Sequence, residues 1–142
     1  MSKSMNRRFS DQLAQCECCP RKCGVNRLDG KMGFCRIGGD VLISYAGLHS
    51  GEEPPISGTR GSGTVFFAGC NLRCVFCQNH QISQDFRPDQ MTVMTTDQLA
   101  AEMLRLAEAG AHNINLVSPS HVVFQAADAI VDARTRGLSI PI

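Results

Sequence analysis

The sequence lacks tryptophan, has a single tyrosine, and carries almost no net charge. Lysine and arginine together number 14 against 13 acidic residues, which gives a formal net charge of +1. A chain with so little excess of one sign has no electrostatic field that would steer a polyanion, and it offers few aromatic side chains for stacking. Nucleic acid is therefore not an expected partner.

Long apolar runs are missing as well. No stretch approaches the roughly 18 apolar residues that a membrane span requires, and the first ten residues lack the apolar core of a secretory signal peptide. The eight cysteines would indicate disulfides in a secreted protein. Without such a signal we expect reduced thiols in the cytoplasm and no membrane partner.

The charge that is present is unevenly distributed. Residues 1–40 hold eight lysines and arginines against four acidic residues, whereas the remainder holds six against nine. Six of the seven phenylalanines and nearly all the apolar runs lie beyond residue 30. This asymmetry predicts a Cys-rich N-terminal module over residues 1–40, a strand with a connecting loop over residues 41–63, and an α/β unit over residues 64–142.

The α/β unit is read from its hydrophobic pattern. Apolar and β-branched runs predict strands at residues 41–46, 64–68 and 114–117, with an irregular connection over residues 47–63. An amphipathic helix is predicted over residues 95–109, with Thr95 and Gln98 as a capping box. A second helix follows residues 118–121 and ends near Gly137; its expected cap is Ser120 and its expected apolar face is Val123, Ala127 and Ile130.

The apolar run at residues 138–142 begins what we expect to be one more strand. Strands that alternate with helices favour right-handed βαβ units in a parallel sheet. The sequence therefore predicts about three parallel strands and two helices, which is an open and incomplete sheet.

The most specific motif is a set of three cysteines directly after the predicted strand at residues 64–68. Cys70, Cys74 and Cys77 have CxxxCxxC spacing. Structural zinc and ordinary electron-transfer clusters take four protein ligands, whereas three thiolates leave one iron of a 4Fe-4S cluster open. Two other readings exist: three buried thiols acting as small hydrophobes, or a zinc site completed by His80 or His49.

The strand, the spacing and the aromatic Phe76 together resemble the cluster loop of radical S-adenosylmethionine (SAM) enzymes. In that superfamily the residue before the last cysteine lies against the adenine of SAM. A narrower resemblance, to the pyruvate formate-lyase activating enzyme-like subgroup, rests on four further strings: CxxCPRxCGVNR at residues 16–27, GxC at residues 33–35, EEPxISG at residues 52–58, and the whole of residues 61–83.

This resemblance implies a fold. Radical SAM enzymes use a partial (βα)6 barrel with the cluster loop after the first strand. The sequence would supply the first third of that barrel, preceded by the small Cys-rich loop module, and the family's later strands are not in it.

The resemblance also implies an activity. It implies an oxidoreductase that reductively cleaves SAM to methionine and a 5'-deoxyadenosyl radical, with an electron donor such as a flavodoxin or ferredoxin. An activating enzyme would abstract hydrogen from a glycyl radical enzyme. The alternatives are a truncated, catalytically inert fragment that binds an iron-sulfur cluster or zinc, and a zinc-binding interaction module.

Several other side chains are candidates for binding SAM or the cluster. Arg73 either tunes the charge of the cluster or binds the SAM carboxylate, or it is a solvated surface arginine, and Asn79 follows the last cysteine closely enough to reach the cluster. The family often places Gly-Gly-Glu after the second strand, and this sequence has Ser118 and Ser120 there instead. They remain candidate SAM contacts because α/β sheets bind ligands at the carboxyl ends of their strands.

The remaining cysteines offer a second metal site. Four thiolates could hold zinc or an auxiliary cluster, namely Cys16, Cys19, Cys23 and Cys35. The other reading is unliganded thiols, since their spacing is not a common zinc signature. Cys18 could replace Cys16 or Cys19.

The polar group of His49, Glu52 and Glu53 is typical of a surface loop. No catalytic residue is assigned from the sequence.

Overall fold

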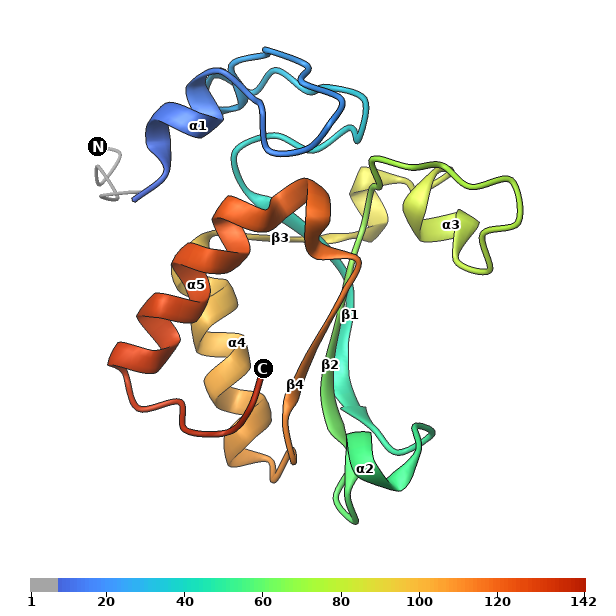
Figure 1. The fold of residues 1–142 in the computed structure, drawn as a ribbon, viewed down its shortest axis with the longest axis vertical. Helices are drawn as coiled ribbons and strands as arrows, with labels where there is room; N and C mark the ends of the chain where they lie inside the picture. Colours follow the sequence, from blue (N-terminus) through green and yellow to red (C-terminus); the bar gives the residue numbers. More distant parts are fainter. Residues whose placement is uncertain (1–7) are drawn as a thin grey trace.

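The structure, a computed structural model, describes residues 8–142 and is built on one four-stranded sheet. The strands are β1 (Val41–His49), β2 (Ser62–Phe67), β3 (Thr92–Met94) and β4 (Ile114–Val117), in the spatial order β3-β1-β2-β4. Helices α4 (Thr96–Glu108) and α5 (Val123–Thr135) lie side by side on one face of this sheet (Figure 1).

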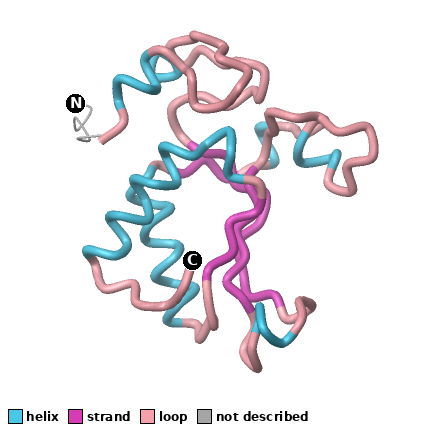
Figure 2. Tube along the Cα trace, viewed as in Figure 1, coloured by secondary structure: helices cyan, strands magenta, loops and turns pink. Residues whose placement is uncertain are grey.

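Short elements fill the connections. They are α1 (Ser10–Ala14), α2 (Pro54–Ser57) and α3 (His80–Ser83), with 3-10 turns at Arg27–Asp29, Pro88–Gln90 and Pro119–Val122. Much of the N-terminal segment and of the connection after β2 is loop (Figure 2). The Cys-rich module that we predicted over residues 1–40 begins with α1, and its residues 1–7 lie outside the described part.

The structure has one parallel pair where about three parallel strands were predicted, because the third strand, expected at residues 138–142, does not form. β2 and β4 are parallel, but β1 is antiparallel to both β2 and β3. Residues 50–61, which include α2, join β1 to β2 as an antiparallel pair, whereas the parallel pair of β2 and β4 is joined by a crossover that includes α4.

Two boundaries also differ from prediction. β1 continues to His49, and α2 lies within the connection that we expected to be irregular. No strand forms at residues 138–142; instead the Ile114 amide donates to the Pro141 carbonyl at 2.8 Å. The C-terminal run therefore touches the start of β4 without pairing along it.

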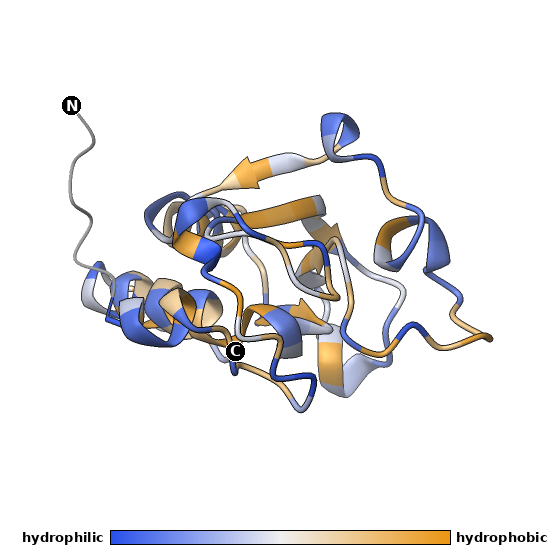
Figure 3. Ribbon diagram, turned by 90° about the horizontal axis from the view of Figure 1, so that it is seen from above, coloured by the Kyte–Doolittle hydropathy of each residue, from blue (hydrophilic) through white to orange (hydrophobic). Residues whose placement is uncertain are grey.

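Helix α4 confirms the capping prediction. The Gln98 amide donates to Thr95 Oγ1, and the Thr95 amide donates to Gln98 Oε1 at 2.9 Å. The apolar face of this amphipathic helix is fully buried, and it consists of Leu99, Ala100, Met103 and Leu106. Figure 3 shows hydrophobic segments in the strands and alternating hydrophobic and hydrophilic segments in the helices.

Helix α5 departs from prediction in its cap and its face. It begins at Val123 after a 3-10 turn and has no side-chain cap, so Ser120 does not cap it. Val123 is 41% exposed. The helix turns small residues inward, which lets it pack closely against α4, and its buried residues are Gln125, Ala126, Ala129 and Ala133.

The N-terminal segment contributes to the same core as the sheet. Cys35 and Ile37 belong to the apolar cluster that contains Val65 of β2 and Leu99 of α4. Gly63 in β2 allows a close approach between β2, β4 and α4, because a Cβ there would lie 2.9 Å from Ile114 Cδ1 and 3.0 Å from Leu106 Cβ. Within residues 8–142 no helix is long and apolar enough to cross a bilayer.

We predict that Gly63→Ala destabilises the protein. The new methyl group would overpack the contact between β2, β4 and α4, which typically costs about 1–3 kcal/mol. The matched control is Gly38→Ala, where a Cβ would meet nothing closer than 3.9 Å. The free energy of unfolding from urea titration should fall for the first variant and stay within about 0.5 kcal/mol of the parent for the second; equal stabilities would contradict the packing described here.

Candidate functional site

The cysteine loop leaves the carboxyl end of β2 through a glycine turn. Gly69 has φ of +79°, and a Cβ on it would lie 2.5 Å from the Cys35 carbonyl oxygen. Its amide donates to the Ile82 carbonyl at 2.9 Å, which closes the base of the loop. Only glycine meets both requirements, the left-handed backbone and the close approach.

The carboxyl ends of the two parallel strands share a cavity. This cavity of about 60 Å³ is lined by Phe67, Gly69, Cys70, Cys77, Asn79, Ile82, Ser83, Val117 and Ser118. β2 and β4 are hydrogen-bonded neighbours with Phe66 opposite Val117. The cysteine loop and the segment after β4 therefore meet at the edge where open α/β sheets bind their ligands.

The three cysteines of the loop are held in different ways. The Cys70 thiol accepts from the Leu72 amide at 3.4 Å, and the Cys77 thiol lies 3.3 Å from Ser83 Oγ. Cys74 is held through its backbone, since Gln84 Nε2 donates to its carbonyl at 3.1 Å. All three thiols are free and partly exposed.

The structure brings together some of the predicted site residues. Cys70, Cys77, Asn79 and Ser118 line the same cavity, whereas Cys74, Phe76, Arg73 and Ser120 do not. Phe76 is 84% exposed. Across residues 8–142 no three histidine, cysteine or acidic side chains are arranged so that they could hold a metal ion.

Ser118 and His121 mark the end of β4. Ser118 has a left-handed backbone with φ of +54°, an uncommon conformation for a residue with a side chain. His121 is fully buried, and its Nε2 lies 2.9 Å from the Ala68 carbonyl oxygen at the end of β2. Burial lowers the pKa of His121, so the ring is neutral near pH 7. The sequence analysis missed this residue because nothing in its surroundings along the chain signals burial.

Arg73 is occupied by the N-terminal segment. Its guanidinium carbon lies 4.3 Å from the centroid of the Phe34 ring, and its NH2 donates to the Phe34 carbonyl at 2.8 Å. Arg21 stacks over the same ring at 3.8 Å and donates from Nε to the Asn71 carbonyl at 2.9 Å. A cation over an aromatic face is worth about 0.5–1 kcal/mol at an exposed site.

Among the N-terminal cysteines, the structure pairs Cys16 with Cys18. Cys16 lies beside Cys18, with their sulfurs 3.4 Å apart, rather than beside Cys19. Burial alone would raise the pKa of Cys16, but hydrogen bonds from Cys18 and Arg27 bring it below its usual value. Burial and the neighbouring Cys16 raise the pKa of Cys18 to about 12. Two thiols in one pair thus differ strongly in acidity.

The other two members of the predicted set lie near one another in the chain's fold. The Cys23 thiol accepts from the Phe34 amide at 3.4 Å, next to Cys35. Cys35 is buried, which raises its pKa. The polar group around His49 lies at the surface as predicted, with His49 Nε2 3.9 Å from Glu52 Oε1.

A buried arginine joins the N-terminal segment to the end of β4. Arg27 is 1% exposed and donates to the Gly38 and His121 carbonyls, each at 2.8 Å. The same guanidinium lies 3.4 Å from the Cys18 sulfur and 3.9 Å from that of Cys16. It therefore holds a thiol pair, the segment before β1 and the turn after β4 in one place.

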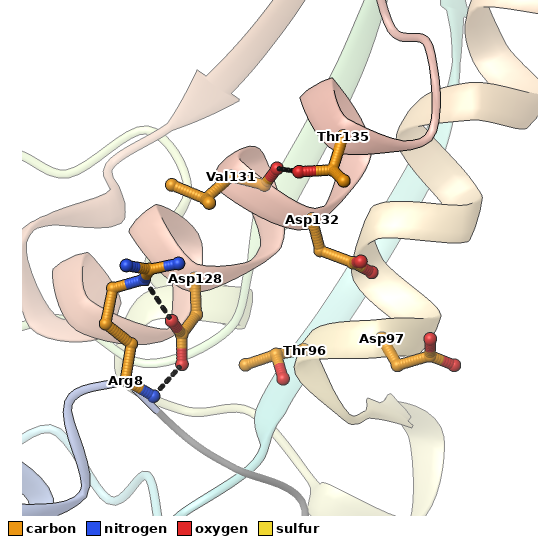
Figure 4. Close-up of a pocket in the computed structure, with 7 residues that line it drawn as sticks. All are labelled: Arg8, Thr96, Asp97, Asp128, Val131, Asp132 and Thr135. Atoms are coloured by element: carbon orange, nitrogen blue, oxygen red, sulfur yellow. Dashed lines mark hydrogen bonds and ion pairs between the residues drawn. The ribbon is translucent and has the colours of Figure 1, made fainter.

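A second cavity, of about 320 Å³, lies along α4 and α5 and shares no residue with the first (Figure 4). Its carboxylates are already paired. Asp128 accepts from the Arg8 amide at 3.1 Å, and Arg136 NH1 lies 3.3 Å from Asp97 and 3.1 Å from Asp132. We regard it as a solvated groove with ion pairs at its rim.

Comparison with known proteins decides the family. Residues 64–135 match the radical SAM superfamily. The chain belongs to the radical SAM superfamily. The match covers the cysteine loop, the parallel strand pair and both long helices, so the shared cavity lies within it. Membership implies an iron-sulfur cluster and SAM, and three free thiols in one short loop are a donor set suited to such a cluster.

Two curated proteins that are similar to this chain are both described as uncharacterized. One is an uncharacterized protein of Methanocaldococcus jannaschii, MJ0674, 48% identical over 69 residues, which are 49% of this chain and 19% of the relative. Another, MJ0808 of the same organism, is 30% identical over 113 residues, 69% of this chain and 33% of the relative. The chain thus spans at most a third of the relatives it matches. No solved structure matches significantly.

We predict that Arg27→Lys lowers stability. Lysine keeps the charge but cannot reproduce the fork that reaches two carbonyls at once, and each hydrogen bond from a charged group contributes about 1.5–3 kcal/mol. The control is Arg60→Lys, at an exposed position. Thermal and urea unfolding should show a loss of at least about 1.5 kcal/mol for the first variant and almost none for the second. Equal losses of unfolding free energy in the two variants would mean that the two hydrogen bonds from the Arg27 guanidinium do not stabilise the protein.

Proposed function

We propose that residues 64–142 are the N-terminal part of a radical SAM barrel and that Cys70, Cys74 and Cys77 bind its 4Fe-4S cluster. The observation that carries this proposal is the cavity shared by Cys70, Cys77 and Ser118 at the carboxyl ends of the parallel strands β2 and β4. Membership of the radical SAM superfamily implies the 4Fe-4S cluster, and we propose that this cavity is where the cluster and SAM meet. The loop cysteines are partly exposed and can therefore be reached by iron and sulfide.

When bound, the cluster supplies the electron that cleaves SAM to methionine and a 5'-deoxyadenosyl radical. The chain's own residues would bind and orient SAM. Phe76 presents an exposed ring that can lie against the adenine, and Ser118 and Asn79 line the cavity with polar groups. Ser120 is exposed nearby in the turn after β4. Arg73 is the weakest of these candidates because its guanidinium is engaged with Phe34.

We propose further that the protein is an oxidoreductase of the pyruvate formate-lyase activating enzyme-like group. The support is the set of sequence strings at residues 16–27, 33–35 and 52–58. A glycyl radical enzyme would then be the substrate, and a flavodoxin or ferredoxin the electron donor. Both proposals concern activity and partners beyond the third or less of the relatives' length that this chain spans.

The cysteine assignment predicts a sharp difference between two variants. Anaerobic reconstitution of the parent with iron and sulfide, followed by SAM and dithionite, should give cluster iron and 5'-deoxyadenosine. Cys74→Ala should lose most of the cluster iron and reduce 5'-deoxyadenosine to the level without protein. Cys19→Ala, a cysteine outside the loop, should retain both. Iron analysis and chromatography of the product measure these outcomes.

Three results would count against this proposal. Parent-level iron in Cys74→Ala would remove that residue from the ligand set. A parent that takes up zinc but no iron would replace the radical SAM reading of this chain with a zinc-binding one. A parent that takes up the cluster but yields no 5'-deoxyadenosine would be a cluster-binding fragment without activity of its own.

We also propose that the N-terminal cysteines form a second site for zinc or an auxiliary cluster, and that Cys18 takes the place that the sequence gave to Cys19. The support is the 3.4 Å separation of the Cys16 and Cys18 sulfurs. Zinc–sulfur bonds of about 2.3 Å in a tetrahedron place two sulfurs about 3.8 Å apart. Cys23 and Cys35 would complete the four ligands.

The proposed second site predicts that Cys18→Ser lowers the metal content of the purified protein and that Cys19→Ser does not. Elemental analysis of zinc and iron per chain, before any reconstitution, measures this. Equal metal content in parent and Cys18→Ser would return the site to unliganded thiols. A loss confined to Cys19→Ser would restore the assignment read from the sequence.

A further inference from the structure

Two arginines from distant parts of the chain stack on one aromatic ring. Arg21 and Phe34 belong to the N-terminal segment, while Arg73 lies between the first two cysteines of the loop. The guanidinium carbons of Arg21 and Arg73 lie 3.8 Å and 4.3 Å from the centroid of the Phe34 ring. We call these three residues the arginine stack.

Hydrogen bonds cross between the two segments in both directions. Arg21 Nε donates to the Asn71 carbonyl of the cysteine loop at 2.9 Å, and Arg73 NH2 donates to the Phe34 carbonyl of the N-terminal segment at 2.8 Å. The stack therefore fixes the first turn of the loop from two sides. A merely solvated arginine would show neither the ring contact nor the bond to a distant carbonyl.

The backbone of Arg73 is also constrained. Its φ is +57°, in the left-handed region that a residue with a side chain seldom adopts. Such a conformation persists where surrounding contacts determine it. The contacts of Arg73 with Phe34 hold its backbone in this conformation. Arg73 lies between Cys70 and Cys74, so the same contacts constrain the loop between these two cysteines.

The charges of the stack lie near the place where a cluster would bind. Arg21 donates to the backbone of the cysteine loop and Arg73 lies between two of its cysteines, so both guanidinium groups lie near any cluster that the loop holds. A cluster held by three thiolates carries negative charge, which increases when it accepts an electron. Nearby positive charge stabilises the reduced form and raises the reduction potential.

We propose that Arg21, Phe34 and Arg73 are positioning residues that hold the cysteine loop in its binding conformation and keep two positive charges beside the cluster. This inference rests on the proposed function of the loop. It removes Arg73 as a direct ligand of SAM and gives the N-terminal segment a part in setting the reduction potential of the cluster.

The first test needs no cluster. Hydrogen exchange of the loop amides at residues 70–79 is measured by mass spectrometry on the metal-free chain. Phe34→Leu and Arg21→Gln should raise the exchange rate of this loop several-fold. Phe34→Tyr, which keeps the aromatic face, should restore slow exchange. Arg87→Gln is the matched control, because Arg87 is exposed and its guanidinium is paired with Asp89 at 2.9 Å.

The second test measures the reduction potential of the reconstituted cluster by electron paramagnetic resonance at controlled potentials. Arg21→Gln and Arg73→Gln should each make reduction about tenfold less favourable, a shift of about 59 mV to more negative potential. Arg87→Gln should leave the potential unchanged. A KM for SAM that stays at the parent value in Arg73→Gln would agree with a positioning role rather than a binding one.

The outcomes separate this inference from the proposed function. Unchanged exchange in Phe34→Leu and Arg21→Gln would overturn the positioning role whether or not a cluster binds. A cluster that forms and cleaves SAM with the same potential in all variants would overturn the electrostatic role and leave the proposed function standing. A parent that binds no cluster would overturn the proposed function and the electrostatic role together.

Discussion

The rest of the structure depends on one buried cation. Arg27 is removed from water, and its partners are backbone carbonyls and thiol sulfurs. A buried guanidinium without such partners would cost several kcal/mol, so the groups around it are required to stay in place. Those groups belong to the Cys16–Cys18 pair, to the approach to β1 and to the turn after β4. The Arg27 side chain therefore fixes the position of the N-terminal segment relative to the carboxyl edge of the sheet.

Three contacts hold the loops in place at the carboxyl edge of the sheet. Arg27 and His121 join the turn after β4 to the N-terminal segment and to the end of β2, and Gly69 lets the Cys35 carbonyl approach the base of the cysteine loop. The arginine stack adds a fourth contact farther along the loop. Loops usually move more than the elements they connect. This loop is instead held by a segment that lies far from it in the sequence.

Part of this arrangement was predictable from the sequence. The capping box of α4 and its buried face follow from local chemistry, since Thr95 and Gln98 need only each other and the helix period is regular. The strand before the cysteine loop is equally local. The family could be inferred because three cysteines and an aromatic residue at fixed spacing are a rare combination, and the family match confirmed the superfamily.

What could not be predicted depends on distant contacts. The antiparallel placement of β1 follows from the pairing of residues such as Ile43 and Phe67, which no local pattern reveals. The inward face of α5 is set by how closely it meets α4: of the expected Val123, Ala127 and Ile130 only Ile130 packs against the core, and the buried residues are Gln125 and three alanines. Arg73 looked like a free charge because the ring that receives it lies 39 residues earlier in the chain.

The close approach at Gly69 has a further meaning for the two groups of cysteines. A single hydrogen atom on Gly69 separates the backbone of the N-terminal segment from the base of the cysteine loop, so neither can shift without displacing the other. A side chain at position 69 would push the Cys35 carbonyl and the base of the cysteine loop apart. The two cysteine-bearing segments therefore meet at a contact that no residue type other than glycine permits.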